Sequence, residues 1–393
     1  MKRITLKKGK QESILRHHPW IFSGAIAEAD KDLEEGEPVE IFNDKNEKIA
    51  TGHYQIGSIA VRILHFGEEK IELRDLFHQR LLNAYKMRET LGLKRPDNNC
   101  FRLVHGEGDF LPGLIVDLYG DTAVMQAHSP GMHYERLKIA EALTQLPEAG
   151  IKNVFYKSDT TLPYKAQLDP QNEYLIGKFD GCEALENGLT FNIDWLKGQK
   201  TGFFIDQREN RALLEKFSAG KTVLNMFCYT GGFSVYAMRG GALKVDSVDS
   251  STKATALTEA NISINFGDDK RHTTYAEDAF KFLDRIEKDY YDLIILDPPA
   301  FAKHRSALKN GLIGYRKLNL KAFEKIKKGG VLFTFSCSQV VSKDMFRLAV
   351  FTAASQSGRK VRILHQLTQP ADHPVDISHP EGEYLKGLVL YVE

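Results

Sequence analysis

Hydrophobic and polar positions follow three different patterns along this 393-residue chain. In residues 3–66, short β-rich runs such as 38–42 and 58–64 are separated by turn residues, which predicts a small β-barrel or sheet. In residues 71–91, apolar side chains recur at helical spacing, which predicts a helix of about five turns. Two patterns that differ this clearly indicate separate structural modules.

The rest of the chain divides at about residue 188. Residues 100–186 combine strand-like runs with one helical pattern and predict a small α+β domain; these segments are 113–117, 122–126, 134–146 (helical) and 153–156. From residue 189 onward strands and helices alternate, which is typical of a doubly wound parallel sheet. The segments expected there are 222–226, 233–238, 244–248, 253–265, 293–296, 313–326 and 331–335.

We therefore predict an α/β protein with three domains. Residues 1–70 form the small β-barrel, residues 71–188 the linker helix and central α+β domain, and residues 189–393 a Rossmann-like doubly wound domain.

Composition narrows the class of protein. With 42% apolar and 27% charged residues the chain resembles an ordinary globular protein. It has no apolar run near the ~20 residues of a membrane span and no apolar signal-peptide core in Met1–Lys8, so we expect a cytoplasmic protein without a membrane partner. The cysteines form no Cys-x-x-Cys pair, so no metal site or disulfide framework is expected; they are Cys100, Cys182, Cys228 and Cys337.

Charge is balanced overall but uneven locally. The chain has 53 basic and 52 acidic residues, yet residues 1–18 hold six Lys or Arg against a single acid, Glu12. Such a cluster can bind phosphates, although it can also be an ordinary solvated face. Its first members are Lys2, Arg3, Lys7 and Lys8.

A glycine turn after the 222–226 strand suggests a nucleoside cofactor. Gly231 and Gly232 would let backbone N–H groups approach a ligand, and Asp249, at the end of the next strand, could accept both ribose hydroxyls. The turn lacks the Gly-x-Gly-x-x-Gly spacing of a dinucleotide site, and Asp278 offers an acceptor for adenine, so S-adenosylmethionine (SAM) fits best. A plain strand–turn–helix connection is the alternative. The candidate cofactor residues are Asn225, Phe227, Tyr229, Thr230, Gly231, Asp249, Ser250, Asp278 and Ala279.

Two reactive groups follow buried-strand patterns. Asp297 opens the Asp-Pro-Pro sequence after 293–296, and Cys337 follows 331–335. Ligands of open α/β sheets bind outside the carboxyl ends of the strands. Asp-Pro-Pro recurs in enzymes that methylate bases, and Ala300 in place of an aromatic residue favours carbon over an exocyclic amine as the acceptor. Methylation of cytosine C5 needs a thiolate at C6, so Cys337 is the candidate nucleophile and Asp297 could bond N3.

Other interpretations stay open at this stage. Cys337 could be a core residue, and Cys228 is a rival nucleophile. Lys303, His304 and Arg305 could supply positive potential for the thiolate or be a solvated loop. The enzyme could instead methylate a ring or exocyclic RNA nitrogen, for example guanine N7, without a covalent intermediate. A third hypothesis is an RNA-binding assembly factor without catalysis.

The motifs together resemble those of the bacterial 23S ribosomal RNA cytosine-5 methyltransferases, the large-subunit methyltransferase I group. The resemblance runs nearly end to end, and its most specific part is 198–211. The other matching segments are 225–233, 297–301, 314–319, 336–338 and 372–374.

This resemblance implies an N-terminal PUA RNA-binding domain, a central domain and a C-terminal methyltransferase domain. It implies that Cys337 is the nucleophile, that Asp297 lies beside cofactor and base, and that Gln207 and Arg208 line the methionine end of the SAM pocket. Large-subunit ribosomal RNA is the implied partner, and the oligomeric state is open, with a homodimer as one expectation. The predicted RNA-binding residues are Lys2, Arg3, Lys7, Lys8, Trp20, Lys303 and Arg305.

One departure concerns product release. Many cytosine-5 methyltransferases carry a second cysteine directly after Asp-Pro-Pro, where this chain has Ala300. A water molecule or a neighbouring side chain must therefore remove the C5 proton.

Overall fold

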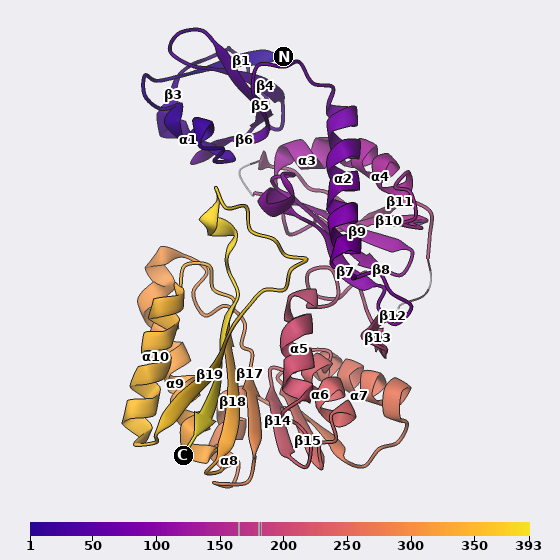
Figure 1. The fold of residues 1–393 in the computed structure, drawn as a ribbon, viewed down its shortest axis with the longest axis vertical. Coiled ribbons are helices and arrows are strands. Elements are labelled where there is room, and N and C mark those ends of the chain that lie inside the picture. The colour runs from indigo at the N-terminus through magenta and orange to yellow at the C-terminus, as the bar shows by residue number, and fades with distance from the viewer. Residues whose placement is uncertain (164–165, 180, 182) are drawn as a thin grey trace. The chain divides into compact units, whose positions relative to one another are not determined.

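The computed structural model describes residues 1–163, 166–179, 181 and 183–393, so Cys182 lies outside the described residues (Figure 1). The chain forms two compact units. Unit 1 consists of Met1–Gly188, Ile193–Ile205 and Ala371–Gly382; unit 2 consists of Leu189–Asn192, Asp206–Pro370 and Glu383–Glu393. A short C-terminal segment therefore belongs to unit 1 although both of its flanks belong to unit 2. The predicted three-domain boundaries remain a prediction.

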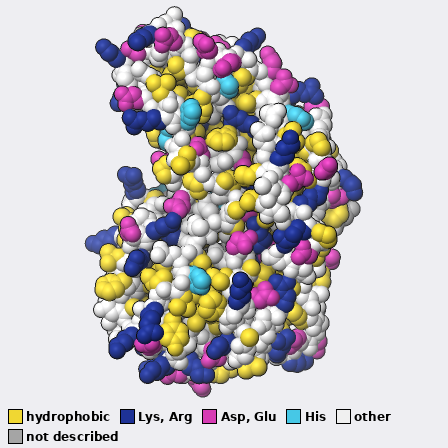
Figure 2. All heavy atoms as spheres, viewed as in Figure 1, with side chains coloured by type: hydrophobic (Ala, Val, Ile, Leu, Met, Phe, Trp, Pro, Cys, Tyr) yellow, Lys and Arg dark blue, Asp and Glu magenta, His cyan; other side chains and the backbone are white. Residues whose placement is uncertain are grey.

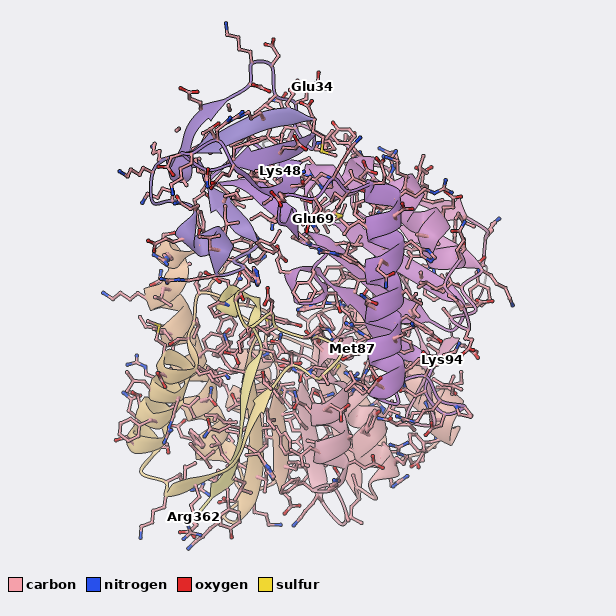
Figure 3. The ribbon with its side chains drawn as sticks, turned by 45° about the horizontal axis from the view of Figure 1, so that its top comes forward. Glu34, Lys48, Glu69, Met87, Lys94 and Arg362 are labelled. Atoms are coloured by element: carbon pink, nitrogen blue, oxygen red, sulfur yellow. The ribbon has the colours of Figure 1, made fainter. Side chains whose placement is uncertain are left out.

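The N-terminal part of unit 1 is a six-stranded sheet in the order β2-β6-β5-β4-β1-β3. Its strands are β1 (Lys2–Leu6), β2 (Trp20–Phe22), β3 (Ile26–Ala29), β4 (Pro38–Phe42), β5 (Lys48–Tyr54) and β6 (Ile59–Phe66), with α1 at Glu12–Leu15. The short β-rich runs predicted at 38–42 and 58–64 are strands β4 and β6, and apolar side chains of the sheet form a small core. Lys48 of β5 donates to the backbone oxygen of Glu69 at 3.0 Å, just past the sheet (Figure 3).

The central part of unit 1 is a five-stranded sheet in the order β11-β10-β9-β8-β7. Its elements are α2 (Leu73–Thr90), β7 (Cys100–His105), β8 (Leu114–Tyr119), β9 (Thr122–Ala127), α3 (Pro130–Tyr134), α4 (Arg136–Thr144), β10 (Asn153–Tyr156) and β11 (Glu173–Ile176), with β12 (Glu183–Glu186) following. Helices α2 and α4 share one core with the strands, which confirms the predicted linker helix. The single helix expected at 134–146 is two helices, because Ser129 caps an earlier start and the backbone leaves the helix at Glu135.

Unit 2 is a seven-stranded sheet in the order β16-β15-β14-β17-β18-β20-β19 (Figure 1). The strands are β14 (Thr222–Met226), β15 (Lys244–Asp249), β16 (His272–Ala276), β17 (Leu293–Leu296), β18 (Gly330–Ser336), β19 (Val361–Thr368) and β20 (Lys386–Val392). The helices are α5 (Arg208–Glu215), α6 (Gly232–Arg239), α7 (Thr252–Phe266), α8 (Ala279–Arg285), α9 (Leu308–Lys325) and α10 (Lys343–Ser357), and β13 (Leu189–Asn192) also belongs to this unit. Side chains of α8, α9 and α10 form one core with the central strands.

Unit 2 confirms the α/β prediction, with one difference in the sheet. The first five strands are parallel, but β20 runs antiparallel between β18 and β19. Burial pattern reveals that a strand is covered on both faces but not which way it runs. Edge strand β19 is mostly exposed and so gave no sequence signal; its Arg362 forms an ion pair with Glu393 at 2.8 Å (Figure 3).

None of the helices described is both long and apolar enough to cross a membrane. No cluster of three or more His, Cys, Asp or Glu within the described ranges is arranged to hold a metal ion.

Candidate active site

The glycine turn lies between β14 and α6 in unit 2. Phe227, Tyr229 and Gly231 all have left-handed backbone conformations, with φ of 60°, 50° and 78°. A Cβ atom added to Gly231 would lie 2.6 Å from the Thr258 side chain, so both conformation and space require glycine there. The turn thus brings the chain sharply from the strand end to the first N–H groups of α6.

Helix α7 holds this turn in place. Thr258 donates to the carbonyl of Tyr229 at 3.0 Å, and Asn261 donates to the carbonyl of Thr230 at 2.8 Å. The Cys228 thiol lies 3.6 Å from the Thr258 hydroxyl, and burial raises the pKa of Cys228 to about 12. A thiol that stays protonated is a poor nucleophile, which favours a packing role for Cys228 over a nucleophilic one.

Asp249 ends β15 beside the turn. Its carboxylate accepts the N–H of Tyr229 at 3.1 Å and that of Ser251 at 2.9 Å. These bonds fix the orientation of the carboxylate while leaving lone pairs that can accept hydroxyl groups. Ser250, the next residue, is exposed. The geometry fits the predicted ribose contact.

Asn225 supplies a second acceptor at the end of β14. Its amide nitrogen donates to Ser234 at 2.8 Å, whereas its buried Oδ1 has no partner among the described residues. A buried acceptor without a partner costs about 1–3 kcal/mol. Such an atom at the strand end fits a site that binds a polar cofactor.

Asp278 has a structural role that sequence reasoning did not foresee. Its Oδ1 accepts the N–H groups of Phe280 and Lys281, both at 3.0 Å, and so caps α8, while Ala279 is buried behind it. The exposed carboxylate can still accept a further donor. Its contact with adenine remains a prediction.

Asp297 stands at the carboxyl end of β17. Gln207 donates its amide to Asp297 Oδ2 at 3.1 Å and accepts a bond from Asn210 at 2.6 Å. The structure therefore joins the 198–211 segment to the Asp-Pro-Pro loop, as the predicted site requires. Arg208 is buried next to Gln207 and lies 3.2 Å from the Glu209 carboxylate. Contacts of Gln207 and Arg208 with a cofactor remain predictions.

Cys337 stands at the end of β18, the parallel neighbour of β17. Its Sγ is partly exposed and lies 4.0 Å from the carbonyl oxygen of Pro298. Ser338 holds the two loops together, because its hydroxyl bonds Tyr315 of α9 at 2.8 Å and accepts the N–H of Ala302 at 3.3 Å. Thiol and carboxylate loops thus meet at one sheet edge.

Sequence reasoning missed Lys386. This buried lysine donates to the carbonyls of Ser338 at 2.7 Å and Val341 at 2.6 Å, in the turn after Cys337. A lysine before an apolar run is an ordinary strand start, so nothing in the sequence marked it. By contrast Lys303 and Arg305, the cations expected near the thiol, lie on an exposed segment.

The predicted RNA-binding residues of unit 1 mostly have internal partners. Lys2 pairs with Glu37 at 3.0 Å; the Arg3 guanidinium lies 3.9 Å from the Phe42 ring centre; Lys7 donates to Gly24 at 2.9 Å; and Trp20 donates to Glu107 at 2.8 Å. Lys8 is exposed. Figure 2 shows basic side chains scattered among acidic and apolar ones on the visible face. RNA contacts of these residues remain predictions.

Comparison with known proteins gives consistent matches. A family model for S-adenosylmethionine-dependent methyltransferases matches residues 102–388, and a model for a PUA-like domain matches residues 4–66. Ribosomal RNA large subunit methyltransferase I of Tolumonas auensis is 39% identical over 396 residues, covering 98% of both chains. The protein of that name from Escherichia coli is 37% identical over 399 residues, covering 99% of both. The fold also matches the crystal structure of SMU.776 complexed with SAH, with a TM-score of 0.85, 23% identity and 100% coverage of both chains.

Proposed function

Because this chain belongs to the ribosomal RNA large subunit methyltransferase I family of SAM-dependent methyltransferases, we propose that it methylates C5 of a cytosine in 23S ribosomal RNA through a covalent bond to Cys337. Family membership confirms the predicted SAM-dependent rRNA methyltransferase class, its cofactor and its PUA-like domain. The choice of C5 and the roles of single residues are our proposal.

The observation that carries the proposal is the meeting of Cys337 and the Asp297 loop at the ends of adjacent parallel strands, with Sγ 4.0 Å from Pro298 O. The Cys337 thiolate would add to cytosine C6, and the displaced electron pair would make C5 nucleophilic while N3 accepts a hydrogen bond or proton by way of Asp297. Bound SAM supplies the methyl group to C5. A water molecule or a neighbouring side chain would then take the C5 proton, and the C5–H electron pair would re-form the C5=C6 double bond and expel the Cys337 thiolate.

The cofactor would lie over the glycine turn. We propose that Asp249 binds the ribose hydroxyls, because two backbone N–H groups already orient its carboxylate. Asn225 and the left-handed turn at Gly231 would complete this end of the site. Gln207 would lie between the cofactor and Asp297, to which it donates at 3.1 Å, with Asp278 toward adenine and Arg208 toward the methionine end.

RNA phosphates would be bound by the basic segment that follows the Asp297 loop. Residues 300–328 hold nine Lys or Arg and a single acid, Glu324. Three of these lysines have partners: Lys321 pairs with Asp284, Lys327 with Asp292, and Lys325 donates to Ile286. The others form no ion pair with any residue the structure describes; they are Lys303, Arg305, Lys309, Arg316, Lys317 and Lys328. We propose that these cations, Lys303 and Arg305 among them, bind RNA phosphates.

The test uses ribosomal RNA containing 5-fluorocytosine, whose fluorine blocks elimination. With SAM and wild-type protein we expect a protein–RNA adduct that survives denaturation and is absent in Cys337→Ala. The buried Cys228 provides the control, because Cys228→Ala should still form the adduct. Methyl transfer to ordinary RNA by Cys337→Ala at the wild-type rate, without any adduct, would move the acceptor to nitrogen and reject the covalent mechanism.

A further inference from the structure

Lys386 closes the turn that carries the proposed nucleophile. It begins β20 and is the register partner of Ser336, the residue before Cys337. Its side chain is buried, and its ammonium donates to the carbonyl oxygens of Ser338 at 2.7 Å and Val341 at 2.6 Å. These bonds bring both ends of the 337–341 turn to one side chain.

Burying a lysine at this position has a high desolvation cost. Two carbonyls can be satisfied by neutral donors, whereas a buried ammonium loses its hydration and usually needs a carboxylate partner. No carboxylate within the described ranges pairs with Lys386, and nearby Glu383 is paired with Lys343. Burial lowers the pKa of Lys386 to about 8, and the strongest opposing effect comes from Cys337. A thiolate at Cys337 would therefore compensate the ammonium more than Glu383 does.

We propose that Lys386 is a positioning residue for Cys337: its ammonium fixes the 337–341 turn and stabilises the Cys337 thiolate. The proposal rests on the function above only in treating Cys337 as the nucleophile. In this proposal Lys386, rather than Lys303 or Arg305, supplies the local positive charge.

Three other charged or titratable sites near the reactive turn do not offer that charge: Tyr315, Asp297 and the Glu383–Lys343 pair. Tyr315 of α9 hydrogen-bonds to Ser338, and burial raises the pKa of its phenol, so it stays neutral. Asp297, on the neighbouring loop, is an acid and disfavours a thiolate. Glu383 and Lys343 offset each other in an exposed pair. Lys386 is thus the cation of this set that no carboxylate neutralises.

The experiment measures the pH dependence of Cys337 alkylation by iodoacetamide in the full-length protein without RNA, with the Cys337 peptide quantified by mass spectrometry. A free cysteine titrates near pH ~8.5, and we expect wild-type Cys337 to titrate lower. Lys386→Met should raise its midpoint by about one pH unit or more, a tenfold loss of thiolate below the midpoint. Lys386→Arg, which keeps the charge, should recover most of the shift.

Lys325→Met is the matched control. Lys325 also donates to two carbonyls of unit 2, Asp284 O at 3.1 Å and Ile286 O at 2.7 Å, but these lie outside the reactive turn. Lys325→Met removes a similar set of lysine-to-carbonyl hydrogen bonds. The pH midpoint of Cys337 alkylation should nevertheless stay unchanged. An equal shift in both variants would make the effect one of general loosening and overturn the proposal.

A reciprocal measurement covers the case in which Lys386→Met does not fold. Coupling between two sites acts equally in both directions, so Cys337→Ala should lower the pH midpoint of Lys386 labelling by an amine-acylating reagent. An unchanged Lys386 midpoint overturns the proposal. If wild-type protein forms the 5-fluorocytosine adduct but neither midpoint moves, only the role of Lys386 fails. If the midpoints move but no adduct forms, the C5 mechanism fails and the Lys386–Cys337 coupling stands.

Discussion

Arg88 of unit 1 and Lys386 of unit 2 are both buried cations, but they are neutralised in different ways. In unit 1, Arg88 is fully buried and paired through both terminal nitrogens with Asp109, and it also donates to the carbonyls of Arg102 at 2.8 Å and Asp372 at 2.7 Å. In unit 2, Lys386 is buried against carbonyls alone. The Arg88 charge is neutralised by a carboxylate and contributes to stability. The Lys386 charge has no carboxylate partner within the described residues, so it can act on the neighbouring Cys337.

The surfaces show the same contrast. In unit 1 most of the N-terminal cations named above are engaged internally, as in the Lys2–Glu37 pair, and Lys8 is the exposed exception. In unit 2 the exposed Lys317 of α9 has no ion-pair partner in the part of the chain that is described. We expect the cations that have an ion-pair partner to contribute to stability, and the exposed cations without one to bind RNA phosphates.

Breaking the matched pair should have the largest effect on stability. Arg88→Met leaves Asp109 buried without its partner, which typically costs about 3–5 kcal/mol of unfolding free energy. Both tryptophans, Trp20 and Trp195, lie in unit 1, so urea unfolding followed by tryptophan fluorescence measures this loss. Adding Asp109→Leu should restore much of it. A loss below about 1 kcal/mol would show that the pair is not what fixes unit 1.

The charge of Lys386 should make the unfolding free energy depend on pH. The pKa of Lys386 falls from 10.5 to about 8 on folding, which corresponds to about 3 kcal/mol. Between these pH values the unfolded chain binds more protons than the native protein, so unfolding free energy rises with pH. We expect the wild-type protein to gain up to about that amount over Lys386→Met from pH ~8 to ~10.5, measured by circular dichroism. Subtracting the unfolding free energy of Lys386→Met from that of the wild type at each pH removes the contributions of the other titrating groups. A difference that does not change with pH contradicts this prediction.

A buried titratable group of unit 1 that lacks a partner should be neutral. His53 is buried, its Nε2 has no partner in the described residues, and burial lowers its pKa to about 4. As pH falls from 6.5 toward 4 the unfolded chain gains a proton that native His53 does not, so stability falls by up to about 1.4 kcal/mol per pH unit. In His53→Gln this loss of stability between pH 6.5 and 4 should be absent, as measured by acid unfolding followed by tryptophan fluorescence. An unchanged pH slope would mean that His53 is charged.

The smallest effect should be on the salt dependence of RNA binding. Lys317→Gln should reduce the slope of log affinity against log salt by about 1, because one phosphate contact is lost. Lys2→Gln should change the slope less, since Lys2 is committed to Glu37. Equilibrium binding to a ribosomal RNA fragment at several salt concentrations measures both. The reverse order would place the phosphate contacts on unit 1.

Local rules predicted what lies at the ends of parallel strands. Gly231, Asp249, Asp297 and Cys337 each follow a strand pattern, so one topological rule brings them to the same sheet edge. Lys386 escaped the same reasoning because β20 is an antiparallel insertion between β18 and β19. The roles that depend on non-local pairing are therefore the ones a single sequence does not reveal.

The central domain shows the same limit. Strand and helix patterns indicated α2 and β8. They did not indicate that Arg88 pairs with Asp109 or that Arg88 also donates to the carbonyl of Asp372. Nothing in the local pattern connects residues 284 positions apart. Likewise the sequence position of Asp278 is compatible both with a contact to adenine and with the helix cap that the structure shows.

The assignment of Ala371–Gly382 to unit 1 has a consequence for how the protein is made. Arg88 receives its last acceptor from Asp372, and the backbone N–H of Arg102 is bound by the carboxylate of the same residue at 3.0 Å. A ribosome synthesising this chain must therefore translate nearly all of it before its first half can complete its core. The N-terminal sheet has a core of its own and can fold first, in the usual order for successive domains. A release of the nascent chain before Asp372, however, leaves Arg88 without its last acceptor.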